Sequence, residues 1–426
     1  MKLRTYVEQG YPLDSFMVNP HIDSLFHWLD SSPTPFHVVN TAQAALHDAG
    51  FVLHDGLSNS LASRGYFIRD GALVAWSLGD THAPFRIVGA HTDSPNLRIQ
   101  PNPDVVSHGW AQLGIEIYGG VLLNSWLDRD LGIAGRVVSS DGSTTLFSIN
   151  EPLARIPQLA IHLDREINDR GLQLDRHQHT VPVWGVQTPV FSEWLQDVVG
   201  VTSISAFDAH LFDIQKAACL GVDSSLIASA RLDNQLSCWA AIHGLIHSQS
   251  SYACIAVLND HEEVGSESTT GAGGPLLDSL LAIIDSQQDA SVGQSHDRRL
   301  ASWCLSADNA HAIHPNYRER HEPRHAPLPN NGVALKLNGN QRYATSARGA
   351  SHIRNVAESK DVPLQTFVSR NNMPCGSTIG PITATRLGID AIDVGVPQLS
   401  MHSIREMCGA EDPGHLLNLV QAFLAF

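Results

Sequence analysis

Histidine and acidic side chains recur directly after short, strand-like apolar runs, and this recurrence most restricts the folds open to the chain. The runs and the residues that follow them are 85–90 with His91 and Asp93, 254–258 with Glu262 and Glu263, and 303–305 with Asp308. Such runs, alternating with helical periodicity, predict an α/β fold. In open α/β sheets ligands bind beyond the carboxyl ends of the strands, so we expect these side chains to converge.

Helical periodicity appears over residues 232–248 and 274–284. A final helix is expected to open at Asp412 as N-cap, with Pro413 in the first helical turn, and to run to about residue 423. The polar stretch 286–299 is expected to be a loop or a helix end.

Residues 101–223 differ from the rest of the chain. Their pattern is mostly β-like with closely spaced turn residues, and a long helix is hard to place before about Glu193. We therefore expect a β-rich domain of residues 101–223 inserted into one α/β domain made of residues 1–100 and 224–426.

The composition disfavours several classes of protein. The chain carries 27 Lys and Arg against 43 Asp and Glu, a net charge of −16, which argues against nucleic acid or an anionic membrane as the main partner. No apolar run is long enough to span a membrane. Six cysteines without a CxxC pair predict free thiols in a reducing compartment. The first residues contain no apolar signal-peptide core, so we expect a cytoplasmic protein.

Imidazole and carboxylate donors without thiolates suit zinc, cobalt or manganese. Two His, two Asp and one Glu exceed the three protein ligands of a single catalytic zinc, but they suit two metals that share one bridging carboxylate. Of the adjacent pair Glu262 and Glu263, one can ligate while the other takes a proton from a metal-bound water. Asp93 can orient the imidazole of His91. The candidates at strand or helix ends are His91, Asp233, Glu262, Glu263, Asp308 and His402.

Each of these signals has a simpler explanation when it stands alone. Asp233 alone is most simply a helix N-cap, and the Glu262–Glu263 pair alone is most simply a solvated face. Their recurrence at five element ends favours a metal site.

Longer segments resemble the aspartyl aminopeptidases, a family of di-metal exopeptidases. They run in the family's order and span nearly the whole chain. The segments are SPTPFH (32–37), GAHTDSP (89–95), NSWLDRDLGIAGRV (124–137), RIPQLAIHLDR (155–165), ARLDNQLSC (230–238), EEVGS (262–266), SADNAHAIHPNY (306–317), NQRYAT (340–345), CGSTIGPI (375–382) and MHSIREM (401–407). The resemblance implies a metallopeptidase domain with a central mixed sheet flanked by helices, and it implies that residues 101–223 form the family's dimerisation domain.

The resemblance also implies a role for each matched residue. His91 and Asp308 would hold one metal, Glu263 and His402 the other, and Asp233 would bridge both. Glu262 would be the general base, with Asp93 behind His91. The implied cofactors are two divalent ions per subunit, with zinc expected and cobalt or manganese as alternatives. His162 would polarise the scissile carbonyl in a neighbouring subunit's site, within a tetrahedral dodecamer that encloses its active sites. Lys336, Tyr343 and His311 match positions that contact the substrate.

Lys336 also stands out without the resemblance, because it is one of only four lysines. It lies in a strand-like run, 332–340, so it is either a strand residue that faces solvent or a pocket cation that pairs with an acidic substrate side chain. Two residues depart from the family's pattern: His261 stands where some members carry Asn, and Asn309 stands where Met is expected. Neither departure removes a ligand, but His261 places a titratable group beside the base and Asn309 changes the packing below the site.

Together these observations predict an aminopeptidase that removes N-terminal Asp or Glu from peptides through a metal-bridging hydroxide, with Glu262 as base. Two alternatives remain. One is a related di-metal hydrolase, such as an N-acyl amino acid deacylase. The other is a self-assembling scaffold with a vestigial metal site, against which the intact ligand set argues.

Overall fold

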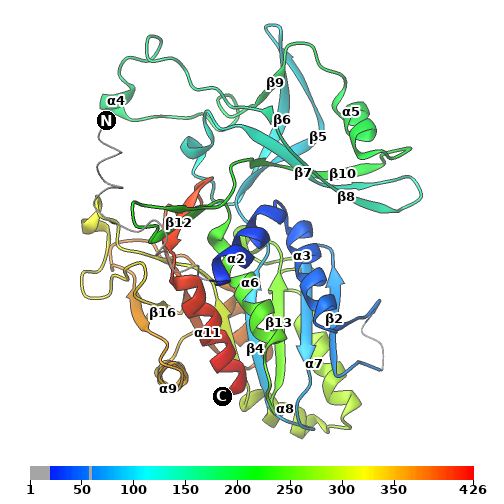
Figure 1. Cartoon of the computed structure of the whole chain (residues 1–426), viewed down its shortest axis with the longest axis vertical. Helices are drawn as coiled ribbons and strands as arrows, with labels where there is room; N and C mark the ends of the chain where they lie inside the picture. The colour runs from blue at the N-terminus through cyan, green and yellow to red at the C-terminus, as the bar shows by residue number, and fades with distance from the viewer. Residues whose placement is uncertain (1–19, 57–59) are drawn as a thin grey trace, which may run out of the picture.

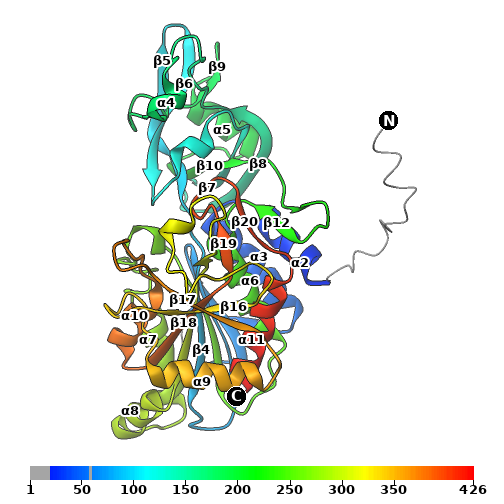
Figure 2. The same ribbon diagram turned by 90° about the vertical axis from the view of Figure 1, so that its left-hand side faces the viewer.

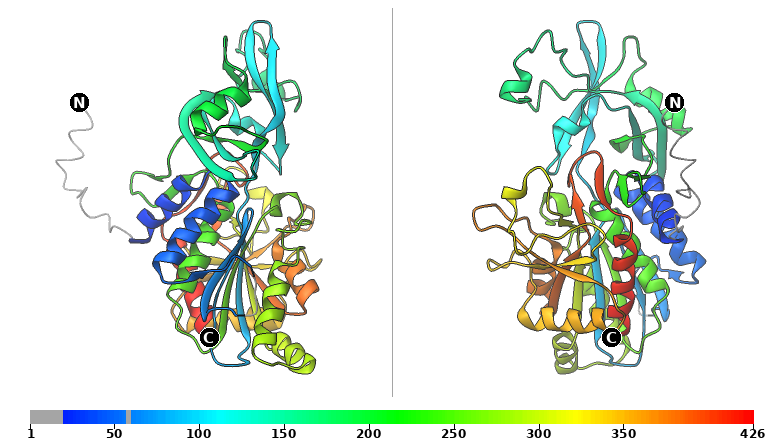
Figure 3. Two further views of the ribbon diagram at one scale, coloured as in Figure 1. Left: turned by 90° about the vertical axis from the view of Figure 1, so that its right-hand side faces the viewer. Right: turned by 60° about the vertical axis from the view of Figure 1, so that its left-hand side comes forward.

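The computed structural model describes residues 20–56 and 60–426. An α/β body lies below a β-rich body in the view of Figure 1, and the chain passes from the first to the second and back. Figure 2 and Figure 3 show the same two bodies from other sides, joined through short connecting segments.

The α/β body is built on a nine-stranded sheet. Four adjacent strands, β13, β4, β14 and β18, run parallel, whereas β3 and β16 flank them antiparallel, so the sheet is mixed. In spatial order the strands are β1 (Val52–Leu53), β2 (Arg64–Arg69), β3 (Ala72–Ser77), β13 (Ala253–Asn259), β4 (Phe85–His91), β14 (Trp303–Ala307), β18 (Asp390–Gly395), β16 (Val333–Leu337) and β17 (Leu364–Val368).

Helices cover both faces of this sheet, and every residue of its central strands is therefore buried. Each face carries its own apolar core. Successive side chains of β4 point to opposite faces. Val88 packs into the core under α2 (Pro20–Ser31), α3 (Pro35–Asp48), α6 (Leu232–Ile246), α9 (Ala347–Glu358) and α11 (Asp412–Ala425). Ile87 packs into the opposite core, under α7 (Leu276–Gln287) and α10 (Ile379–Leu387). This architecture confirms the expected α/β class.

The β-rich body is a six-stranded antiparallel sheet with one longer helix, α5 (Phe191–Val199), and a short one, α4 (Ile167–Arg170). Phe191 and Leu195 of α5 pack into its core. Its strands begin at residue 96 and end at residue 213. In spatial order they are β8 (Thr144–Ala154), β7 (Leu131–Val138), β10 (Ala206–Asp213), β5 (Asn96–Ser107), β6 (Trp110–Tyr118) and β9 (Val183–Gly185).

A third sheet continues the α/β body at the carboxyl ends of its parallel strands, because β15 follows β14 in the chain and β19 follows β18. Its strands are β11 (Ala218–Leu220), β12 (Leu226–Ser229), β20 (Glu406–Gly409), β19 (Pro397–Leu399) and β15 (Ala310–His311). Three 3-10 turns complete the described elements: η1 (Leu123–Trp126), η2 (Glu262–Val264) and η3 (Arg318–Arg320).

Two sequence expectations need correction. The polar stretch 286–299 contains a helix, α8 (Val292–Leu300), which a capping box between Ser291 and Gln294 opens. Its one buried residue, Arg298, pairs with the buried Asp285 of α7 over 2.7 Å, and this ion pair anchors a helix whose other residues are exposed or half-buried. Asp412 is not an N-cap, because its carboxylate instead accepts hydrogen bonds from the backbone N–H groups of Asn330 and Gly332.

All six cysteines are free, as expected. Within the described residues, every helix is too short or too polar to cross a membrane.

Candidate metal centre

The carboxyl ends of the parallel strands bring the candidate ligands into one cluster. His91 ends β4, Glu262 and Glu263 lie in η2 after β13, and Asp308 follows β14. Nε2 of His91 lies 3.4 Å from Oδ1 of Asp233, 3.9 Å from Oε2 of Glu262 and 3.9 Å from Oδ1 of Asp308. Nε2 of His91 therefore faces three carboxylates in this first group.

A second group shares the same aspartate. Nε2 of His402 lies 3.6 Å from Oδ2 of Asp233 and 3.3 Å from Oε2 of Glu263. The two oxygens of Asp233 thus face different histidines, which is the arrangement that a carboxylate bridging two metal ions requires. Two ligand triplets share Asp233, and all donor atoms of each lie within 4.8 Å of one another: His91, Asp233 and Asp308, and Asp233, Glu263 and His402. A third triplet that meets the same limit is His91, Glu262 and Glu263.

The backbone at the start of α6 presents Asp233 to the cluster. Arg231 is in the left-handed region at φ 59°, Asp233 has non-helical φ and ψ, and the Asp233–Asn234 peptide bond is cis. The N-cap position belongs to Arg231, so the simpler explanation of Asp233 as a helix N-cap is wrong. Instead, Oγ of Ser94 donates to the Asp233 carbonyl over 2.7 Å and fixes this turn.

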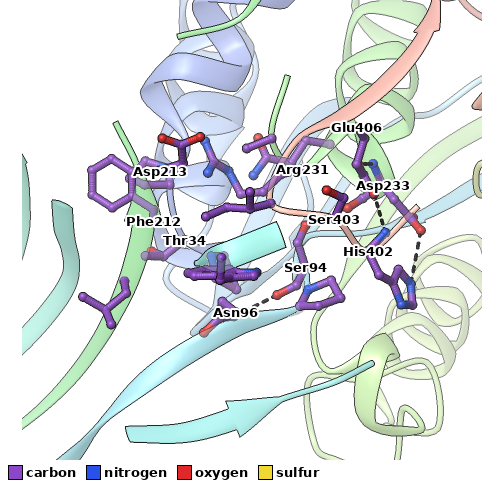
Figure 4. Close-up of a pocket in the computed structure, with 18 of the residues that line it drawn as sticks. Thr34, Ser94, Asn96, Phe212, Asp213, Arg231, Asp233, His402, Ser403 and Glu406 are labelled. Atoms are coloured by element: carbon purple, nitrogen blue, oxygen red, sulfur yellow. Dashed lines mark hydrogen bonds and ion pairs between the residues drawn. The ribbon is translucent and has the colours of Figure 1, made fainter. Parts of the chain in front are cut away.

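Glu406 links the two sides of the cluster through the backbone. Its Oε2 accepts the N–H of Asp233 over 2.9 Å, and its Oε1 accepts the N–H of His402 over 2.8 Å. Figure 4 shows Glu406 beside Asp233, with His402 below both in that view. His402 is itself in the left-handed region at φ 66°, a conformation that costs a non-glycine residue energy and is held here by that hydrogen bond. Sequence reasoning missed Glu406, although it lies within the MHSIREM segment.

Backbone carbonyls fix which nitrogen each histidine offers. Nδ1 of His91 lies 3.0 Å from the carbonyl oxygen of Asp93, and Nδ1 of His402 lies 3.1 Å from that of Gly120. A carbonyl can only accept, so Nδ1 carries the proton in both rings and Nε2 is free to ligate.

The carboxylate of Asp93 holds the turn that carries the two glutamates. It lies 3.4 Å from Nδ1 of His91, but its Oδ1 and Oδ2 also accept the backbone N–H groups of Glu262 and Glu263 at 3.1 and 3.0 Å. Tyr118 of β6 donates its hydroxyl to Oδ2 over 2.7 Å. Asp93 therefore orients the η2 turn as well as the ring of His91. Tyr118 helps to fix the Asp93 carboxylate, and no sequence pattern indicated this contact.

Burial and mutual repulsion shift the pKa values of the cluster. Burial raises the pKa of Glu262 to about 8 and that of Glu263 well above its usual value, and the Asp233 carboxylate adds to both shifts. Burial lowers the pKa of His402, but its contacts with Asp233 and Glu263 outweigh burial and raise that pKa to about 10. The carboxylates of this cluster outnumber its positively charged side chains, and bound divalent cations would supply the missing positive charge.

Unpaired buried oxygens also fit a metal. Oδ1 of Asp233 and Oε1 of Glu263 are buried and have no hydrogen-bond partner in the described part of the chain. Such orphaned acceptors are costly unless an ion or water binds them. The donor set of imidazoles and carboxylates suits zinc, cobalt or manganese.

A cavity of about 430 Å³ opens beside the cluster. Lys336, Tyr343 and His311, the three residues expected to contact the substrate, all line it. Lys336 is only 2% exposed, and its Nζ lies 4.0 Å from Oδ1 of Asp308, so the alternative of a solvent-facing strand lysine is wrong. A smaller cavity between the two bodies reaches the opposite side of Asp233, and Figure 4 shows residues that line it, including Thr34, Arg231 and Asp213.

His162 lies apart from this constellation. It is an exposed residue in a turn before α4 of the β-rich body, and within the described residues it does not line the cavity.

The two departures from the family's pattern lie next to the cluster. Nδ1 of His261 pairs with Oγ of Ser268 over 2.9 Å. The Asn309 amide donates to the carbonyl of Leu232, the residue before Asp233, over 2.8 Å.

A mixed α/β sheet with a buried histidine and carboxylate cluster at the ends of its parallel strands defines a metallohydrolase. The family described as "Aminopeptidase I zinc metalloprotease (M18)" matches residues 28–424. The chain belongs to this M18 family and is therefore a zinc metallo-aminopeptidase of the aspartyl aminopeptidase type.

Relatives and solved structures agree with this assignment. The chain is 47% identical over 423 residues to a protein named "Probable M18 family aminopeptidase 2" from Streptomyces coelicolor, covering 95% of this chain and 97% of the relative. A Streptomyces avermitilis protein of the same name is 48% identical with the same coverage. The structure is similar to Ape4 in its complex with Nbr1, with a TM-score of 0.88 at 34% identity over 94% of this chain and 84% of the other. It also resembles the Saccharomyces cerevisiae mApe1 dodecamer, with a TM-score of 0.82 at 27% identity over 94% and 95% of the two chains.

Proposed function

We propose that this aminopeptidase binds two divalent metal ions and removes Asp or Glu from the N-terminus of peptides. The observation that carries the proposal is the buried ammonium of Lys336 in the wall of the cavity beside the metal ligands. A buried cation beside a substrate cavity favours a substrate group of negative charge.

Each residue of the cluster has one role in this proposal. His91 and Asp308 would hold one metal, Glu263 and His402 would hold the other, and Asp233 would supply a carboxylate oxygen to each. When bound, the metals polarise the peptide carbonyl and lower the pKa of a coordinated water molecule. Glu262, which lines the cavity, takes the proton from the attacking water and passes it to the leaving amine.

Kinetics on three matched substrates test the specificity. Asp-, Asn- and Leu-peptides differ at the first residue, and Asn keeps the shape of Asp without its charge. We expect kcat/KM to be highest for Asp, and equal values for all three would refute the acidic preference. Cleavage of N-acetyl-Asp peptides in preference to free ones would instead favour a deacylase. Metal analysis that finds two zinc ions per chain supports the two-metal arrangement, whereas near-zero metal without turnover would favour the scaffold alternative.

We further propose that the β-rich body pairs subunits and that His162 completes the site of a neighbouring subunit. Its exposure in a turn of that body leaves it free to reach a partner, and the similar mApe1 protein is described as a dodecamer. A homo-dodecamer built from dimers is the assembly we propose here. Mixing His162→Ala protomers with Glu262→Gln protomers should restore activity, because one mixed pair forms a complete site. No recovery after confirmed subunit exchange would refute this role.

The six free cysteines support a cytoplasmic location.

A further inference from the structure

A second cavity of about 430 Å³ lies between the loop after β16 and the loop after β17. Its volume falls in the range of small-molecule sites, about 300–1,000 Å³. Its polar lining comes from side chains that donate hydrogen bonds, namely Asn338, Asn340, Arg342, Ser369, Arg370 and Asn371.

This second cavity shares a wall with the substrate cavity. Arg342 lines the second cavity and the next residue, Tyr343, lines the substrate cavity. In the same way Cys375 lines the second cavity and Gly376 the first. Cys375 packs against the small apolar cluster that contains Tyr343. The two cavities therefore adjoin each other at two points of the chain.

The charge of this second cavity is opposite to that of the protein. The chain carries 43 acidic residues against 27 basic ones, yet none of the described residues that line the cavity is Asp or Glu. Within residues 20–56 and 60–426, neither Arg342, which is exposed, nor Arg370, which is half-buried, makes a side-chain hydrogen bond or an ion pair. By contrast, Arg348 on the next helix pairs with Asp390 over 2.9 Å.

We propose that this second cavity binds a carboxylate of the peptide substrate, carried by residues beyond the one held beside the metals. Guanidinium groups bind carboxylates through paired, charge-assisted hydrogen bonds, and the three asparagines add neutral donors. The carboxylate comes either from the C-terminus of a short peptide or from an acidic side chain further along it. The inference rests on the proposed peptidase function and narrows its substrates to short or acidic peptides.

Steady-state kinetics on matched peptides test the site. The substrates are Asp-Ala-Ala with a free C-terminus, its C-terminal amide, and the amide of Asp-Ala-Glu. In Arg342→Gln and Arg370→Gln variants, kcat/KM for the peptides that carry the extra carboxylate should fall about ten- to hundredfold, mainly through KM. The plain amide should change less than about twofold. If kcat/KM falls only for the free acid, the site binds the C-terminal carboxylate. If it also falls for the Asp-Ala-Glu amide, the site binds side-chain carboxylates too.

Arg354→Gln is the matched control. Arg354 is an exposed residue of α9 that does not line the cavity, so the same change of charge there should leave all three substrates unaffected. Equal losses on acid and amide, or no loss in the cavity variants, would overturn the site.

A binding measurement separates this inference from the proposed function. Calorimetry with Ala-Ala-Ala and its amide needs no turnover. If the protein cleaves no Asp-peptide but binds the free acid more tightly than the amide through Arg342 and Arg370, the function fails and the site stands. If it cleaves Asp-peptides but binds acid and amide alike, the site fails and the function stands.

Discussion

The hydroxyl of Tyr118 donates a hydrogen bond to Oδ2 of Asp93 over 2.7 Å. Tyr118 ends β6 of the β-rich body, whereas Asp93 lies two residues beyond the end of β4 in the α/β body. Gly120, two residues after Tyr118, also places its carbonyl against Nδ1 of His402. The β-rich body therefore contributes directly to the geometry of the candidate metal ligands.

Replacing Tyr118 by Phe removes only this hydroxyl and should weaken metal binding. Asp93 would lose one of the donors that fix it, and the turn with Glu262 and Glu263 would be held less firmly. Loss of such an outer contact typically costs about 10–100-fold in metal affinity. Chelator competition with zinc measures this. Tyr317→Phe is the control, because Tyr317 is exposed; unchanged affinity in Tyr118→Phe would show that the contact is incidental.

The adjacent glutamates should respond differently to the same substitution. Glu262→Gln should keep both metals but lower kcat roughly 10²–10⁴-fold, the usual cost of a missing general base. Glu263→Gln should lose metal, because Oε2 of Glu263 lies 3.3 Å from Nε2 of His402 in the second ligand group. Metal content and kcat, measured on both variants, test whether Glu262 is the base and Glu263 the metal ligand. Metal loss in Glu262→Gln would reverse the two roles.

The sequence predicted the site where the chemistry follows strand ends. His91 is the last residue of a buried strand, Glu262 and Asp308 follow the ends of two others, and parallel strands place such residues at one edge. It could not identify Glu406 or Tyr118, because their contacts depend on how the third sheet and the β-rich body dock onto that edge. A single glutamate within a strand, or a single tyrosine at a strand end, produces no sequence pattern that would mark it as part of a site.

The same limit applies to the fold. Strands β4, β13 and β14 and helices α6, α7 and α11 were predicted, because continuous apolar runs and 3.6-residue periodicity are local signals, whereas helices α2, α3, α9 and α10 were not predicted. Helix α8 was missed, because it lacks an apolar stripe and is anchored instead by the buried ion pair of Arg298 with Asp285 of the preceding helix.

Lys336→Met should reduce activity selectively on acidic substrates. Removing one partner of a desolvated charge pair costs about 2–5 kcal/mol, which corresponds to roughly tens- to thousands-fold in kcat/KM. Asn- and Leu-peptides should lose much less, because they carry no charge for Lys336 to pair with.

Lys336 also lies 4.0 Å from Oδ1 of Asp308, so the metal content of this variant must be measured with its kinetics. Equal losses on Asp-, Asn- and Leu-peptides would assign Lys336 to the support of Asp308 rather than to specificity.

The stability of the junction between the two bodies should depend on pH through His210. This residue of β10 is 2% exposed, and neither ring nitrogen has a hydrogen-bond partner among the described residues. Its ring packs edge-on against Phe36 of α3. Burial, followed by the positive charges of Arg98, His37 and Arg136, lowers the pKa of His210 to about 3. The folded protein therefore holds this ring neutral.

The sign of the effect follows from proton binding. In the unfolded chain His210 takes up a proton below its ordinary pKa of about 6.5, whereas the folded protein does not until about pH 3. Between these values the unfolded state binds more protons, so the free energy of unfolding falls as the pH falls, by about 1.4 kcal/mol per pH unit for this group. His210→Leu keeps an apolar side chain against Phe36 and should flatten that slope. Denaturant unfolding at pH 7.5 and 5.5, at fixed zinc, measures it. His296→Leu, at an exposed position of α8, should leave the slope unchanged; an unaltered slope in His210→Leu would mean that other groups set the acid sensitivity.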